Sequence, residues 1–134
     1  MSNPMSVYDI AGRAMSAQLV RLNTTASNLA NAGTIASSKG AAFRALKPVF
    51  ESVGERPGVA TVRVNQVIAS STEPTRRHDP DNPLADGNGD VWEAGVDSAA
   101  EMVEMIETAR QYQNNVQVLQ TAKTLTLDTL RLGK

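Results

Sequence analysis

The chain has 134 residues, the length of one ordinary domain, and a net charge of -1 with a pI near 5.8. This balance gives no electrostatic reason to expect nucleic acid or an anionic membrane surface as a partner. The absence of cysteine excludes a disulfide framework, a thiolate zinc site and a cysteine nucleophile, and only 4% of the residues are aromatic, so we expect no large self-sufficient core.

Near the N-terminus, apolar and small residues recur every three or four positions, which predicts a helix from about Val7 to Ala32 that stops at Gly33. The preceding residues lack a basic segment followed by an apolar run, and no apolar stretch is long enough for a membrane span, so we expect no cleaved signal peptide. The line of apolar and small residues along this helix contains Gly12, Met15, Leu19, Leu22, Ala26 and Leu29.

The same helix carries polar residues that intrinsic helix propensity does not explain. Asparagine and threonine compete for backbone hydrogen bonds and are among the poorer helix formers. Their side chains can instead bond to neighbouring helices, so we interpret Asn23 and Asn28 as contacts with partner subunits. Asn31 has the same interpretation, or it merely marks the frayed end of the helix.

Proline and glycine interrupt the middle of the chain, from Gly33 to Val96. Within it, GVATVRVNQVIAS (residues 58–70) alternates like a strand, with a bulge or bend near Val67. FRALKPVF (residues 43–50) is its candidate partner, at the edge of a sheet because it contains Pro48. Two such strands cannot form a stable sheet without further packing.

Residues 79–92 form a loop whose turns are set by proline and glycine and which ends in a short strand. Asp86, Asn88 and Asp90 alternate like the first ligands of a calcium loop. The similarity ends there, because Val91 stands where glycine is required and no glutamate occupies the twelfth position. We therefore expect a polar turn and no metal site.

A second helix is predicted from Asp97 or Ser98 to Leu132, with either of the first two residues as its cap. Its apolar stripe is wider than one partner helix can cover, so part of it must be buried against other chains. Uncharged polar residues, including Asn114 and Asn115, cluster at its centre and are interpreted as contacts with neighbours. The stripe contains Met102, Met105, Ile106, Ala109, Tyr112, Val116, Leu119, Ala122, Leu127 and Leu130.

These elements predict a mainly α fold, in which long N- and C-terminal helices pack as a coiled-coil-like pair around a short middle segment of strands and loops. Residues 1–33 and 96–134 then form one discontinuous helical assembly domain. Residues 34–95 form a small insert of strands and loops.

The chain offers little for catalysis. His78 is the only histidine, so neither a Ser/His/Asp triad nor a histidine metal cluster can be assembled, and we expect His78 to lie in a solvated loop. Glu101, Glu104 and Glu107 share one side of the second helix and are expected to form a solvated face. We predict that the protein is not an enzyme and uses no cofactor or small-molecule substrate.

Two segments resemble the terminal signatures of bacterial flagellar rod, hook and related axial proteins. These are DIAGRAMSAQLVRLNTTASNLANAG (residues 9–33) and ARQYQNNVQVLQTAKTLTLDTLRLGK (residues 109–134). The short length is similar to that of proximal-rod subunits. NPLADGNGDV (residues 82–91) and VDSAAEMVEMIETARQYQNN (residues 96–115) favour one such subunit over the other short one, FlgB.

The resemblance implies a structural subunit that is exported through the flagellar type III apparatus without a cleaved signal peptide. In the periplasm it would polymerise into the proximal rod, a hollow driveshaft that transmits torque for motility. The partners implied are copies of the chain itself, the rod proteins FlgB, FlgF and FlgG, the rod-base protein FliE and the surrounding rings.

The terminal helices of such a subunit would form the inner tube. A soluble adaptor, whose helical hairpin binds a single regulatory partner, is the alternative. The residues predicted to make assembly contacts are Met15, Leu19, Leu22, Asn23, Asn28, Leu29, Asn31, Met102, Ile106, Tyr112, Asn114, Asn115, Val116, Leu119, Leu127 and Leu130.

Overall fold

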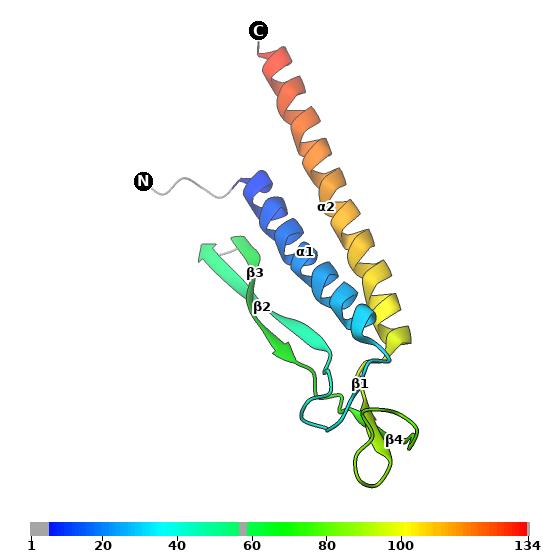
Figure 1. Ribbon diagram of the computed structural model, residues 1–134. Helices are drawn as coiled ribbons and strands as arrows, with labels where there is room; N and C mark the ends of the chain where they lie inside the picture. Colours follow the sequence, from blue (N-terminus) through cyan, green and yellow to red (C-terminus); the bar gives the residue numbers. More distant parts are fainter. Residues whose placement is uncertain (1–5, 57–58, 134) are drawn as a thin grey trace.

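Two long antiparallel helices dominate the computed structural model, which describes residues 6–56 and 59–133 (Figure 1). They are α1 (Val7–Asn31) and α2 (Ser98–Leu132), so both predicted helices are confirmed to within one or two residues at each end. The Ser6 side chain caps α1 in a reciprocal capping box, and Gly33 follows its end with a φ of 79°, the left-handed conformation that favours glycine. Asp97 caps α2 by accepting hydrogen bonds from the next turn.

Two longer strands, β2 (Leu46–Arg56) and β3 (Val59–Ala69), form an antiparallel two-stranded sheet, the hairpin. The strand predicted at residues 58–70 is confirmed from Val59 to Ala69, with Gly58 outside the described residues and Ser70 beyond the end of the strand. Its partner is longer than predicted. The register shifts after Val49, so that Asn65 has no opposite residue, and this bulge lies two positions before the predicted one.

Three shorter strands form a second antiparallel sheet in the order β1-β5-β4. They are β1 (Ile35–Ala36), β4 (Thr75–His78) and β5 (Asp90–Glu93), and the expected short strand after the turn-rich loop is therefore confirmed as β5. Val91, at the centre of this sheet, is fully buried. The sheet lies beyond the end of the helix pair at which α1 ends and α2 begins (Figure 1).

The prediction of a mainly α fold is wrong, because the described residues of the middle segment form five strands in two sheets and the fold is mixed α and β. The strand β2 begins three residues after the start of its predicted segment (residues 43–50) and continues six residues beyond its end, whereas β3 lies within its predicted segment. A two-stranded hairpin is marginal by itself, but here it packs along α1. This contact joins segments that are distant in the chain, so the local alternation of residues does not predict it.

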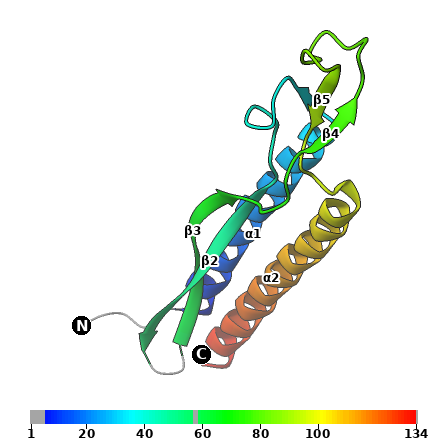
Figure 2. The same ribbon diagram turned by 90° about the horizontal axis from the view of Figure 1, so that it is seen from below.

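The helix α1 lies between α2 and the hairpin, so that the upper part of the molecule has three layers (Figures 1 and 2). Small residues allow this close packing. The apolar residues that are buried in the described part of the chain are Ala11, Ala17, Ala42, Ala45, Val91 and Ala94. Alanine buries little area, so this core contributes modestly to stability. Neither helix, over its described residues, has an apolar stretch long enough to cross a membrane.

Candidate assembly surface

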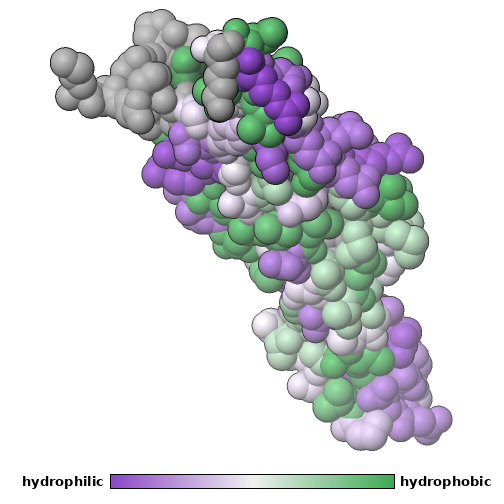
Figure 3. Space-filling view, turned by 90° about the horizontal axis from the view of Figure 1, so that it is seen from above, coloured by the Kyte–Doolittle hydropathy of each residue, from purple (hydrophilic) through white to green (hydrophobic). Residues whose placement is uncertain are grey.

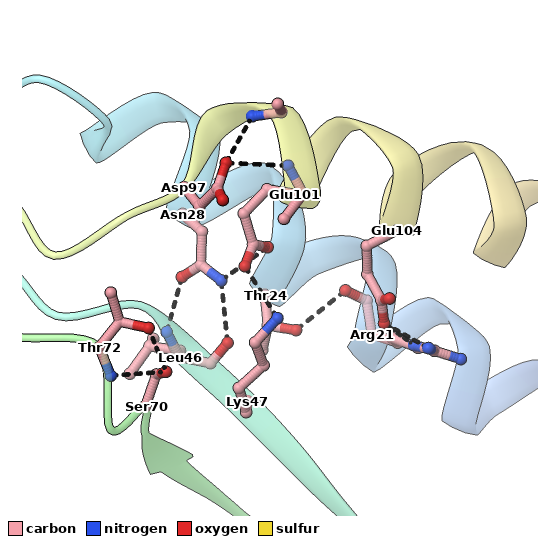
Figure 4. Close-up of polar contacts among 12 residues, drawn as sticks. Arg21, Thr24, Asn28, Leu46, Lys47, Ser70, Thr72, Asp97, Glu101 and Glu104 are labelled. Carbon is pink, nitrogen blue, oxygen red and sulfur yellow. Dashed lines mark hydrogen bonds and ion pairs between the residues drawn. The ribbon is translucent and has the colours of Figure 1, made fainter.

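Several polar residues of α1 are predicted to contact other subunits, and one of them, Asn28, makes its contacts within the chain. Asn28 is fully buried inside the chain, at a point where α1, β2 and α2 meet (Figure 4). Its side-chain Nδ2 donates to the Leu46 carbonyl and to Glu101 Oε2, both at 2.9 Å, and its Oδ1 accepts from the Leu46 N–H at 2.7 Å. Glu101 Oε1 accepts from Lys47 Nζ at 2.9 Å. We call these four residues the Asn28 junction.

Three further polar contacts join α1 to α2 along its length. Arg21 forms an ion pair with Glu104, Gln18 Nε2 donates to Gln111 Oε1 at 2.8 Å, and the hydroxyls of Tyr8 and Thr126 lie 3.3 Å apart. The expectation that Glu101 and Glu104 form a solvated face is therefore wrong. Both carboxylates point at α1, where cationic or amide groups satisfy them (Figure 4).

The outer side of α2 has no partner within the chain. Of the residues of α2, all of which the structure describes, only Glu101 and Thr108 are buried. The large apolar side chains that remain exposed on this helix are Met102, Val103, Ile106, Val118, Leu125, Leu127, Leu130 and Leu132. Hydrophobic residues also lie open between hydrophilic patches on the face seen in Figure 3. Exposed apolar patches of this kind mark interaction sites.

A groove lies between the start of α1 and the C-terminal half of α2. Its apolar lining comes from Val7 on α1 and from Val118, Ala122 and Leu125 on α2. Uncharged polar residues of α2, Asn114, Gln117 and Thr121, complete the lining. A groove of this composition fits an apolar protein segment better than a charged ligand.

The predicted contact residues fall into three groups. Seven are exposed, namely Leu19, Asn23, Met102, Ile106, Asn114, Leu127 and Leu130. Eight are half-buried, namely Met15, Leu22, Leu29, Asn31, Tyr112, Asn115, Val116 and Leu119. The remaining one, Asn28, is engaged within the subunit as described and has no surface to offer a neighbour. Asn31 is the last residue of α1, and its amide donates to the Ser27 carbonyl at 2.8 Å.

Several exposed apolar residues of α2 are absent from the predicted assembly contacts. Val118, Leu125 and Leu132 follow one another at spacings of seven, the repeat of a coiled-coil position, and this signal was available in the sequence. The burial of Glu101 and Thr108 had no comparable local signal, since it depends on the approach of α1.

The loop between β4 and β5 contains a polar turn, as predicted. Asp86 Oδ1 accepts from the backbone N–H groups of Asn88 at 2.8 Å and Asp90 at 3.0 Å, and these bonds lower the pKa of the Asp86 carboxyl. His78, expected in a loop, lies at the end of β4, where it is exposed and its Nδ1 is 2.9 Å from Asp90 Oδ1. Among the described residues, no group of three acidic or histidine side chains is placed to hold a metal ion.

Comparison with known proteins first defines the class. Residues 9–34 match a family described as flagella basal body rod protein, and residues 88–132 match the C-terminal family of the flagellar basal body rod proteins FlgE, FlgF and FlgG. These two segments contain most of α1 and all of α2, the helices whose apolar faces exceed what one chain covers. The two matches thus place the chain in the class of flagellar basal-body rod proteins.

Full-length relatives then specify the family. The chain is 45% identical to the flagellar basal-body rod protein FlgC of Salmonella typhimurium over 97% of this chain and 98% of that protein. It is 46% identical to FlgC of Yersinia enterocolitica, with the same coverage, and 36% identical to FlgC of Aquifex aeolicus over 92% of each chain. The chain belongs to the FlgC family of flagellar basal-body rod proteins, and it is a structural subunit of the bacterial flagellar basal-body rod.

Proposed function

We propose that the subunit polymerises through its terminal helices into the proximal rod, a hollow driveshaft that transmits torque for motility. The observation that carries this proposal is the unpartnered outer side of α2, where the large apolar side chains of a 35-residue helix remain exposed. The torque would then pass through many helix contacts rather than through one site.

The magnitude of the apolar term supports assembly over isolation. Burying a large apolar side chain contributes about 1.5 to 3 kcal/mol. Four such residues of α2 would contribute on the order of 6 to 12 kcal/mol, which is comparable to the whole stability of a typical domain. A core built mainly from alanines gives the isolated subunit modest stability, to which burial in the rod would add this contribution.

The discontinuous division of the chain remains part of this proposal. Residues 1–33 and 96–134 would form the assembly domain, and residues 34–95 would form the insert that projects outwards. The position of the β1-β5-β4 sheet beyond one end of the helix pair supports it (Figure 1). The hairpin packs along α1, so the insert would also stabilise the assembly domain.

The partners that we propose for this surface are further copies of the chain, the rod proteins FlgB, FlgF and FlgG, the rod-base protein FliE and the surrounding rings. We propose that the assembled subunit lies in the periplasm. We also propose that the flagellar type III export apparatus exports it without a cleaved signal peptide. The role is structural, with no enzyme activity, nucleic acid, cofactor or small-molecule substrate. Membership of a basal-body rod family supports this placement.

A charge placed on the outer side of α2 tests the proposal. In a bacterium that lacks its own copy of the subunit, Ile106→Glu should abolish swimming and rod assembly, because a carboxylate cannot be buried among apolar partners without a large cost. Ile106→Leu, which keeps an apolar side chain of similar volume at the same position, is the control and should retain swimming. The helix content of both purified chains should equal that of the wild type.

Normal swimming of the Ile106→Glu strain would contradict the proposal. So would a purified chain that forms one small, defined oligomer through this surface, because that result favours the adaptor alternative.

A further inference from the structure

We infer that the Asn28 junction holds the hairpin at one orientation against the helix pair, and that this orientation is stable only while α2 is paired with α1. The three elements that meet at the junction are far apart in the chain. Asn28 is 18 positions from Leu46 and 73 positions from Glu101. Their meeting is therefore a tertiary event, completed by the C-terminal helix.

The first half of the junction is a side-chain substitute for strand pairing. Asn28 presents an acceptor to the N–H of Leu46 and a donor to its carbonyl, as the backbone of a neighbouring strand would. Leu46 is the first residue of β2, so this pair of bonds attaches the start of the hairpin to α1. An aspartate has no amide donor and a leucine has no polar group, so neither could replace the asparagine here.

The second half connects this attachment to α2. The amide nitrogen that holds Leu46 also donates to Glu101, and the other oxygen of Glu101 accepts from Lys47 on β2. Asn28 is 0% exposed and Glu101 is 3% exposed. If α2 were absent, one Asn28 N–H and the Lys47 ammonium would lose their partner, so the bonds at the base of the hairpin are complete only when α2 is in place.

Glu101 is the side chain by which α2 binds the hairpin. Among the residues that the structure describes, the Lys47–Glu101 ion pair is the only hydrogen bond or ion pair between α2 and the hairpin. The neighbouring Glu104 also joins α2 to α1, but its partner is Arg21 and it has no bond to the hairpin. Glu101 and Glu104 are one turn apart, and both join α2 to α1, but only Glu101 also binds the hairpin. A comparison of the two residues therefore distinguishes the effect of α2 on the hairpin from the pairing of the helices.

The experiment compares Glu101→Ala with Glu104→Ala in the full chain, using amide hydrogen exchange. In Glu101→Ala we expect exchange at the start of β2 to become at least roughly tenfold faster, because the base of the hairpin loses its buried acceptor. In Glu104→Ala we expect no change in β2, although each variant removes one contact between α1 and α2. Glu101→Gln keeps an acceptor for Asn28 and should have a smaller effect than Glu101→Ala.

Equal acceleration in the two alanine variants, or no acceleration in Glu101→Ala, would overturn the inference. Loss of the α2 helix itself in Glu101→Ala would also contradict it, because it would assign Glu101 to helix pairing. The measurement is made on the unassembled chain, so its failure is distinguishable from a failure of the proposed rod assembly.

A second variant provides an independent test. Asn28→Asp would place two carboxylates, those of residue 28 and Glu101, within hydrogen-bonding distance, with the Lys47 ammonium as the only cation of the junction. At neutral pH the hairpin should loosen. As the pH falls and the two carboxyl groups share a proton, the Leu46 amide signal should return towards its wild-type position. Identical behaviour of this variant at neutral and acidic pH would contradict the geometry.

Discussion

The hydroxyl groups of Tyr8 and Thr126 lie 3.3 Å apart and mark the level at which α2 runs past the start of α1. The six residues of α2 beyond this contact extend for about 9 Å at the rise of an α-helix. Within them Leu127, Leu130 and Leu132 are exposed by 45%, 63% and 87%. We call this segment, residues 127–132, the α2 extension. Its apolar side chains have no cover from α1.

The first prediction concerns the α2 extension. Leu130→Glu should change the free energy of unfolding of the isolated chain by no more than about 0.5 kcal/mol, because Leu130 is already exposed. The same substitution should prevent rod assembly, since the leucine is expected to be buried by a neighbouring subunit. Denaturant unfolding of the purified chain and swimming of a complemented strain measure the two effects.

Leu130→Met is the matched control, since it keeps an apolar side chain of similar volume at the same position. It should leave both stability and swimming unchanged. A Leu130→Glu strain that swims like the wild type would show that the α2 extension stays exposed in the rod.

The second prediction concerns Gly95, where two parts of the middle segment touch. A Cβ at this position would lie 2.6 Å from the Thr72 carbonyl oxygen and 3.0 Å from the Pro74 nitrogen. Because both atoms belong to the backbone, Gly95→Ala should lower the free energy of unfolding by about 1 to 3 kcal/mol. Urea unfolding measures this loss.

Gly40→Ala is the control for this substitution, because nothing lies within 4 Å of a Cβ at Gly40. It should be neutral or slightly stabilising through the lower entropy of the unfolded chain. Equal stability of the two variants would show that the backbone near Thr72 yields easily.

The third prediction concerns the pH dependence of the turn at Asp86. Backbone N–H groups of Asp90 and Asn88 hold the pKa of its carboxyl below the ordinary value. A depressed pKa in the folded state contributes stability above the unfolded pKa, and this contribution is lost as the pH falls through the folded pKa. The amide signals of Asn88 and Asp90 should therefore shift towards unbonded positions as NMR spectra are recorded from about pH 6 down to about pH 2.

Asp86→Asn retains a side-chain acceptor for the same two N–H groups but has no titrating group. Its turn should stay closed over this range. If the same acid-induced shift appeared in Asp86→Asn, another group would be responsible for it.

The helices were predictable because their determinants are local. A repeat of three and four over 25 and 35 residues, with Asp97 before one helix and Gly33 after the other, specifies where each begins and ends. The alternation of β3 was visible for the same reason. The length of β2 was not, because its pairing with β3 and packing on α1 join residues that are distant in the chain.

The local pattern of residues is sufficient to predict the two helices, the excess of apolar surface on α2 and the resemblance to flagellar axial proteins. The roles of Asn28 and Glu101, which the pattern alone assigns to a partner contact and to a solvated face, depend on the packing of α1, β2 and α2. The physical reason is that the period of a helix shows which residues share a face. Whether that face is covered by water or by another part of the chain, as Glu101 is by Lys47 and α1, depends on long-range packing.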